Sequence, residues 1–230
     1  MFRLLSKTGD SNSAIARGYR SRFYESTRKR MKIILQGRPG VGKSTILKKI
    51  YTLLESKNPR GCIVEEEREN GDRIGFRIKY LPEGGSTQLA STKEALSNVF
   101  LSKYSINIKA IENELIPYMF NMSSESDHGV FIFDEIGRMQ QKSDKFIPAV
   151  DHIMSISKPV IATIVHNDEI WARKYKNNIE NFVIAITEFN CNYIADTIKT
   201  MLEYYEKHNI YPYDLKNKLN LMTSASRESR

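Results

Sequence analysis

The sequence has few cysteines and no long apolar segment, and each absence narrows the class of protein. Its 230 residues include two cysteines, Cys62 and Cys191, which are too few for a disulfide framework and lack metal-site spacing. No apolar run approaches the roughly 20 residues that cross a bilayer as a helix, so we expect no membrane partner. The apolar content of 40% predicts a globular core. We expect a cytoplasmic protein, because so few cysteines fit a reducing compartment.

Several enzyme motifs are also missing. The chain has no nucleophile elbow and no G-x-G-x-x-G dinucleotide fingerprint. The guanine-reading motif N-K-x-D is absent as well, because residues 217–220 read N-K-L-N and lack the aspartate. A dedicated GTPase is therefore disfavoured. No feature of the sequence predicts an oligomeric state.

The net charge of +8 is concentrated at the N-terminal end of the chain. Residues 1–30 contain eight basic and two acidic side chains, so the other 200 residues carry a net charge of only +2. A basic patch on the folded body, the usual footprint of a nucleic-acid binder, is not expected. We predict a basic, disordered extension over residues 1–30, the only segment through which nucleic acid would bind. The alternative is a mitochondrial transit peptide, which is also rich in Arg and Ser.

One glycine-rich stretch carries the clearest chemical signal. Residues 37–44 read G-R-P-G-V-G-K-S, which matches the phosphate-binding P-loop G-x-x-x-x-G-K-[ST]. Glycines let backbone amides wrap a phosphate, and the following helix directs its positive end at the same anion. Lys43 would reach the β- and γ-phosphates, and the Ser44 hydroxyl would hold Mg²⁺. The predicted nucleotide-binding residues are Gly37, Arg38, Pro39, Gly40, Val41, Gly42, Lys43, Ser44 and Thr45.

A second signal follows a continuous apolar run at residues 130–133. That run predicts a strand buried on both faces, and it ends in Asp134-Glu135. Asp134 is predicted to hold Mg²⁺ through its coordinated water, beside Ser44. Glu135 is predicted to be the general base that polarises the attacking water, as in P-loop ATPases of the additional-strand class. Thr163, near the end of the next apolar strand, is either a sensor of the γ-phosphate or an ordinary strand threonine.

The order of predicted elements indicates an α/β fold. Strands alternate with helices, which predicts a largely parallel central sheet with right-handed crossovers and helices on both faces. Residues 62–90 predict an inserted antiparallel β-meander, with a hairpin turn at Asn70-Gly71. The predicted later helices are residues 107–120, 143–156, 168–180 and 192–206. Asn107 is the predicted N-cap of the first of these helices. Pro117 is expected to kink or end that helix, and Pro148 to kink the second. We predict a P-loop domain over residues 31–206 and a polar tail over residues 207–230.

The sequence resembles the THEP-type nucleoside-triphosphatases of archaea and thermophiles, which include the cancer-related nucleoside-triphosphatase of animals. Four blocks carry the resemblance: residues 37–45, residues 66–68 with 73–76, residues 103–107, and D-E-I-G-R-M at 134–139 with Ser143 and Phe146. The resemblance implies a RecA-like core and slow Mg²⁺-dependent hydrolysis of several nucleoside triphosphates to the diphosphate. The chain departs from the family pattern at Val64, at Ser102 and at residues 187–191, where Cys191 replaces the usual Arg.

Three functions fit these residues. The first is a nucleoside-triphosphate phosphohydrolase with relaxed base choice, acting on ATP, GTP, CTP and UTP. The second is a P-loop kinase that transfers the γ-phosphate to a nucleoside, a nucleic-acid end or a small metabolite, with Arg68, Arg73 and Arg77 as lid arginines. The third is a nucleotide-dependent binding module or switch that uses the basic N-terminal extension.

Overall fold

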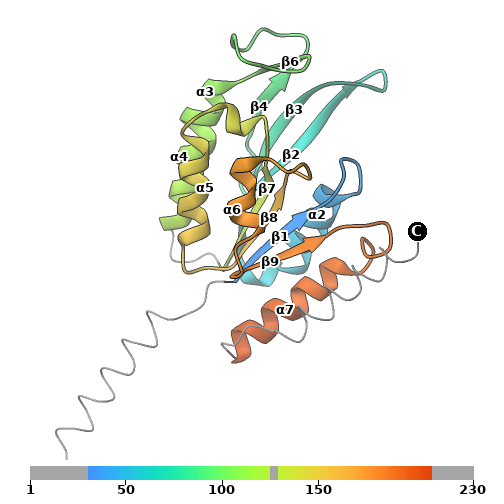
Figure 1. Cartoon of the computed structure of the whole chain (residues 1–230), viewed down its shortest axis with the longest axis vertical. Helices are drawn as coiled ribbons and strands as arrows, with labels where there is room; N and C mark the ends of the chain where they lie inside the picture. The colour runs from blue at the N-terminus through green and yellow to red at the C-terminus, as the bar shows by residue number, and fades with distance from the viewer. Residues whose placement is uncertain (1–30, 125–128, 209–230) are drawn as a thin grey trace, which may run out of the picture.

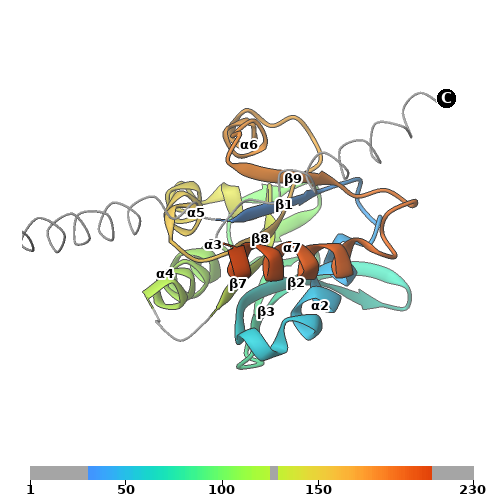
Figure 2. The same cartoon turned by 90° about the horizontal axis from the view of Figure 1, so that it is seen from below.

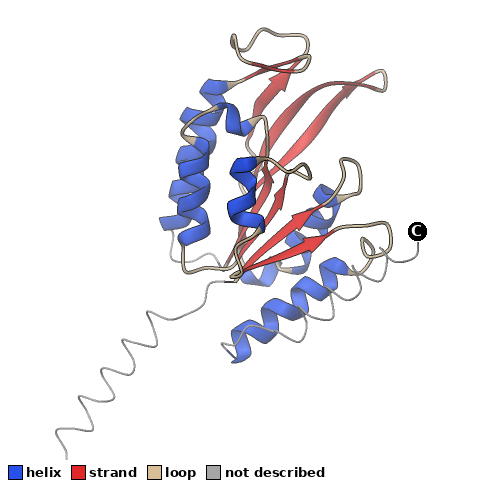
Figure 3. Cartoon of the chain, in the orientation of Figure 1, coloured by secondary structure: helices blue, strands red, loops and turns tan. Residues whose placement is uncertain are grey.

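The computed structural model describes residues 31–124 and 129–208, which form an α/β fold (Figure 1). The predicted extension over residues 1–30 and most of the predicted tail, from residue 209 on, lie outside the described residues. A mixed sheet runs through the described part, and helices cover both of its faces (Figure 3). No helix among these residues is long and apolar enough to cross a membrane.

The sheet has a parallel half and an antiparallel half. Its nine strands lie in the order β5-β6-β4-β3-β2-β7-β8-β1-β9. The strands from β2 to β9 in this order pair in parallel, and those from β5 to β2 pair antiparallel. The bounds are β1 Lys32–Gln36, β2 Pro59–Glu69, β3 Asp72–Leu81, β4 Ser86–Ser91, β5 Phe100–Leu101, β6 Tyr104–Ile106, β7 Val130–Ile136, β8 Val160–Ile164 and β9 Asn181–Ala185. The predicted fold class is confirmed.

Alternating side chains of the parallel strands divide the core into two clusters. On β1, Ile33 and Leu35 join one cluster, and Ile34 joins the other, because successive strand residues point to opposite faces. Helices α2 and α7 cover the first cluster, and α4, α5 and α6 cover the second (Figure 2). The helices and turns are α2 Lys43–Leu53, η1 Glu55–Lys57, α3 Ile108–Ala110, η2 Ile111–Leu115, α4 Ile116–Ser124, η3 Gln140–Lys142, α5 Phe146–Ser155, α6 Ile170–Lys176 and α7 Ile194–His208.

The predicted meander is present, but its first strand also belongs to the parallel half of the sheet. Strand β2 pairs in parallel with β7 over residues 59–62 and antiparallel with β3 along most of its length. Gly61 is at this junction, where an added Cβ would lie 1.7 Å from the carbonyl oxygen of Ile132. The predicted hairpin turn is confirmed, since Asn70 and Gly71 both have positive φ angles, 51° and 88°. The meander therefore extends the main sheet.

Two prolines in helices behave differently from the simplest expectation. Asn107 caps the helix at residue 108 by accepting a hydrogen bond from Ala110 N (3.0 Å), as predicted. Pro117 neither ends nor interrupts this helix, which continues through α4. The wide π turn η2 ends at Leu115, two residues before the proline, and accommodates its missing N–H. Pro148 is the third residue of α5, where a backbone N–H has no intrahelical partner.

Candidate active site

The predicted site residues meet at the carboxyl ends of β1, β7 and β8. Strand β8 lies between β1, which leads into the P-loop, and β7, which carries Asp134 and Glu135. This extra strand is the arrangement expected of the additional-strand class of P-loop proteins. Parallel α/β sheets bind ligands at this edge. The residues that the sequence nominates thus lie together at one edge of the sheet.

The P-loop forms a turn that only glycine accommodates without strain. Gly40 and Gly42 have φ angles of 81° and 96°, in the left-handed region. The Lys43 ammonium group lies across the loop and donates hydrogen bonds to the carbonyl oxygens of Gly37 (2.9 Å) and Arg38 (3.2 Å). Lys43 is also the first residue of α2, so the positive end of that helix points into the loop. The conformation of the loop, with the Lys43 ammonium group and the positive end of α2 beside it, therefore suits the binding of an anion.

Asp134 has one oxygen bonded and one oxygen without a partner. Its side chain is 3% exposed, and Oδ1 accepts a hydrogen bond from the hydroxyl of Thr163, which is fully buried. Oδ2 has no hydrogen-bond partner among the residues that the structure describes. Burial raises the pKa of Asp134, while the hydroxyls of Ser44 and Thr163 and the charge of Lys43 lower it. An unpartnered buried carboxylate oxygen beside Ser44 suits a hard divalent cation.

The described residues do not supply a complete metal site. No group of three or more His, Cys, Asp or Glu side chains in residues 31–124 and 129–208 could hold a metal ion. Mg²⁺ commonly binds through one or two protein oxygens, with waters and substrate phosphates completing its shell. The Ser44 hydroxyl and the Asp134 carboxylate fit that pattern.

Glu135 lies in a confined position next to Asp134. Burial and the charge of Asp134 raise the pKa of Glu135 to about 7, and Lys43 lowers it. A Cβ added at Gly137 would lie 2.6 Å from Glu135 Oε1 and 2.8 Å from Gln140 Oε1. Gly137 therefore leaves the room that the carboxylate occupies. A carboxylate with a pKa near neutrality can accept a proton from water and release it again.

Gln140 is a site neighbour that the sequence analysis missed. Its side chain is 1% exposed, and its Oε1 has no hydrogen-bond partner among the described residues. It belongs to the short turn η3, whose residues carry no periodic pattern that would place them against Glu135. Only the fold brings this amide beside the carboxylate.

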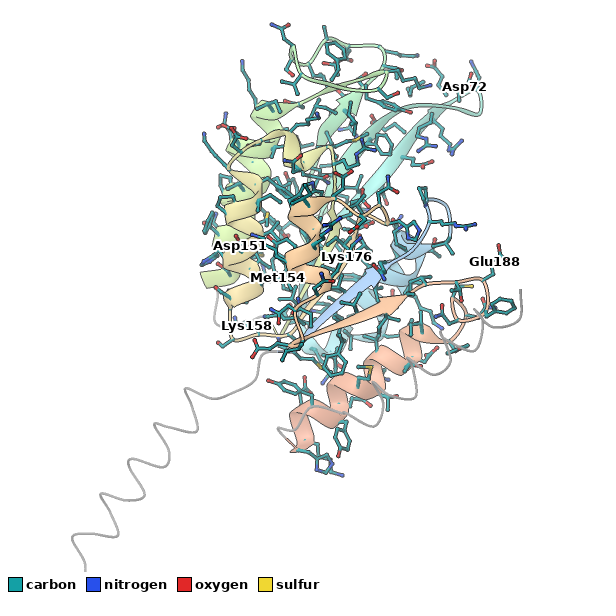
Figure 4. The ribbon with its side chains drawn as sticks, in the orientation of Figure 1. Asp72, Asp151, Met154, Lys158, Lys176 and Glu188 are labelled. Atoms are coloured by element: carbon teal, nitrogen blue, oxygen red, sulfur yellow. The ribbon has the colours of Figure 1, made fainter. Side chains whose placement is uncertain are left out.

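The β8–α6 loop lies beside the P-loop. Lys176 of α6, labelled in Figure 4, donates hydrogen bonds to the carbonyl oxygens of His166 (3.1 Å) and Asn167 (2.9 Å). Burial lowers the pKa of His166, and so do the charges of Lys176, Arg38 and Lys43. The lowered pKa disfavours the charged imidazole next to these cations.

The arginines of the β2–β3 hairpin are paired with glutamates. Glu66 binds both Arg68 (2.6 Å) and Arg73 (3.1 Å), and Glu67 binds Arg77 (2.8 Å). Each guanidinium thus has a carboxylate partner within the same hairpin, which offsets the positive charge that a phosphate lid would need.

The family described as NTPase matches residues 32–199, most of the chain. The chain belongs to this NTPase family. Among its relatives is the nucleoside-triphosphatase THEP1 of Thermotoga sp. (strain RQ2), 37% identical over 76% of this chain and 97% of that protein. The THEP1 of Methanocaldococcus jannaschii is 32% identical over 68% of this chain and 89% of that protein. The resemblance drawn from the sequence blocks is confirmed.

Two solved structures share the fold of this member of the NTPase family. The crystal structure of THEP1 from the hyperthermophile Aquifex aeolicus has a TM-score of 0.67 and 33% identity, covering 75% of this chain and 99% of that chain. The solution structure of a human cancer-related nucleoside triphosphatase has a TM-score of 0.63 and 27% identity, covering 76% and 98%. Both of these proteins match over nearly their whole length.

Proposed function

We propose that this NTPase-family chain hydrolyses nucleoside triphosphates to the diphosphate and phosphate, with Mg²⁺ and with little preference among bases. One observation supports the proposal most strongly. Asp134, at the carboxyl end of β7, has a buried carboxylate oxygen without a hydrogen-bond partner among the described residues, and the pKa of the adjacent Glu135 is raised to about 7. A protein that only binds nucleotides does not need a base tuned to neutral pH.

Each residue has a distinct role in this proposal. The loop amides and Lys43 stabilise the charge that develops on the transferred phosphoryl group. Ser44 and Asp134 would hold Mg²⁺, which neutralises charge on the β- and γ-phosphates when bound. Thr163 fixes the orientation of Asp134, since its hydroxyl donates to Oδ1. Glu135 orients the attacking water and accepts its proton.

The relaxed base choice follows from the lack of base-reading groups in the sequence. Strong rejection of a wrong base requires buried donors and acceptors matched to one Watson–Crick edge. Stacking on an aromatic or apolar side chain is worth roughly 1–3 kcal/mol and tolerates any base. We therefore expect kcat/KM values for ATP, GTP, CTP and UTP within about tenfold of one another, about 1.4 kcal/mol in transition-state stabilisation.

The test is phosphate release from each of the four triphosphates, with Mg²⁺ and with EDTA, beside a Lys43→Ala control. Release from all four that stops in EDTA, and falls in the control because Lys43 binds the phosphates, supports the proposal. A preference of about a thousandfold for one base would show a base-specific pocket. ATP consumption that requires an added metabolite would instead show a kinase. The pairing of the candidate lid arginines with glutamates argues against the kinase.

A further inference from the structure

The strand order sets the direction in which a nucleotide lies on the site. Asp134 and Glu135 belong to β7, which is separated from β1 by β8, and β9 borders β1 on the other side. For hydrolysis the γ-phosphate must face Glu135, on the β8 side of the P-loop. A triphosphate that follows the loop therefore carries its nucleoside toward the β9 side, over the connection between β9 and α7.

That connection touches the P-loop directly. Ile186 N donates a hydrogen bond to the carbonyl oxygen of Gln36 (2.7 Å), the last residue of β1. A Cβ added at Gly37 would lie 2.9 Å from the Ile186 carbonyl oxygen. Figure 1 shows the β1–α2 loop and the β9–α7 connection side by side at the same edge of the sheet. The nucleoside side of the site is thus bounded by residues that follow Ile186.

The turn after Ile186 is braced from inside. Asn190 is buried, its Oδ1 accepts a hydrogen bond from Thr187 N (2.9 Å), and its Nδ2 donates to the Ala185 carbonyl oxygen (2.7 Å). Cys191 N adds a bond to the Thr187 carbonyl oxygen (3.1 Å). These bonds hold the backbone of the turn in one conformation, so the side chains that it exposes need little ordering to bind a ligand.

The braced turn exposes one large aromatic ring. Phe189 is 75% exposed, and it follows Glu188, which Figure 4 labels at this turn. Its Cα lies within about 11 Å of Ile186, because three residues of chain span no more than that. An exposed apolar ring on the connection that borders the P-loop fits one class of ligand, the face of a purine or pyrimidine base.

We propose that Phe189 is the stacking platform for the base of the bound nucleotide. The proposal rests on the nucleotide site described above and adds the residue that contacts the base. Stacking on a phenyl ring uses the π-face that every base has, so it strengthens binding without selecting one base. Phe189 thereby contributes affinity for the nucleoside, and the P-loop contributes affinity for the phosphates.

The experiment compares wild type with Phe189→Ala, Phe189→Tyr and Phe100→Ala. Phe100 is a matched control, because it is 54% exposed on β5, at the opposite edge of the sheet. ADP affinity is measured by titration calorimetry, and KM and kcat are measured for ATP, UTP and inorganic tripolyphosphate, which has no base. We expect Phe189→Ala to raise the ADP Kd and both nucleotide KM values by about 5- to 100-fold, with kcat and the tripolyphosphate KM unchanged. Phe189→Tyr and Phe100→Ala should match wild type.

Two results would overturn the platform. Unchanged ADP affinity in Phe189→Ala would show that the ring does not contact the base. An equal rise in the KM for tripolyphosphate would show that the substitution acts through the P-loop instead. The two proposals fail in different assays. If the hydrolase proposal is wrong, the protein releases no phosphate. The ADP Kd can still be measured in that case, and comparing it between wild type and Phe189→Ala still tests the stacking platform.

Discussion

Glu135 should make the stability of the nucleotide-free protein depend on pH. Burial and the neighbouring Asp134 charge raise the pKa of Glu135 from an ordinary 4.5 to about 7 in the folded state. Below pH 4.5 both the folded and the unfolded state carry the proton, so the raised pKa does not change the free energy of unfolding. Between about pH 4.5 and 7 the unfolded state loses the proton while the folded state keeps it, so the free energy of unfolding falls as the pH rises.

The magnitude follows from the size of the shift. A difference of about 2.5 units, at about 1.4 kcal/mol per unit, lowers the free energy of unfolding by about 3 kcal/mol between pH 4.5 and 7.5. Glu135→Gln removes the titrating group and should remove this part of the slope. Asp134 remains in both proteins, so its own raised pKa contributes to both curves.

The assay is urea unfolding in EDTA at pH 5, 6, 7 and 8, followed by the fluorescence of Trp171, the only tryptophan of the chain. Trp171 packs against the core, so its emission reports loss of tertiary structure. The variant should gain stability relative to wild type as the pH rises, by about 2.5 kcal/mol between pH 5 and pH 8. Parallel curves for the two proteins would refute the proposed environment of Glu135.

Three further substitutions test other contacts of the site and the sheet. Gly137→Ala should lower kcat at least tenfold with little change in KM, because the added methyl occupies the place of the Glu135 carboxylate; steady-state kinetics with unchanged kcat would contradict this. Thr163→Val should raise the Mg²⁺ concentration for half-maximal phosphate release several-fold, since Asp134 loses its fixed orientation; an unchanged Mg²⁺ titration would exclude that role. Gly61→Ala should destabilise the protein by more than about 3 kcal/mol, because its φ of 147° and a carbonyl oxygen 1.7 Å from the new Cβ leave no room; near-native thermal unfolding would disprove it.

Much of the fold could be predicted because its signals are local in sequence. The run at residues 130–133 is continuously apolar because β7 is buried on both faces, and Asn70-Gly71 has the backbone freedom that a tight hairpin needs. The short strands β5 and β6 were missed, because two and three residues are too few to show the alternation of apolar and polar side chains that predicts a strand. The parallel pairing of β2 with β7 was missed too, since it joins residues 71 positions apart, such as Pro59 and Val130.

Some residues of the candidate site could likewise be predicted from local sequence signals, and others could not. Lys43 and Ser44 belong to a contiguous motif, and Asp134 and Glu135 follow one strand, so all four could be named from the sequence. Gln140 could not be named, because its contact with the Glu135 pocket depends on how η3 folds back. The proposed role of Phe189 likewise depends on β9 lying beside β1, which no local pattern reveals.

The most direct measurement of the central claim separates binding from hydrolysis in Glu135→Gln. The variant keeps the P-loop, Lys43 and Asp134, so its Kd for ATP with Mg²⁺ should stay within about threefold of wild type. Phosphate release in a single turnover should fall at least a hundredfold, the lower end of what general-base catalysis contributes. Wild-type release by this variant would contradict the account, because water would then be activated without the Glu135 carboxylate.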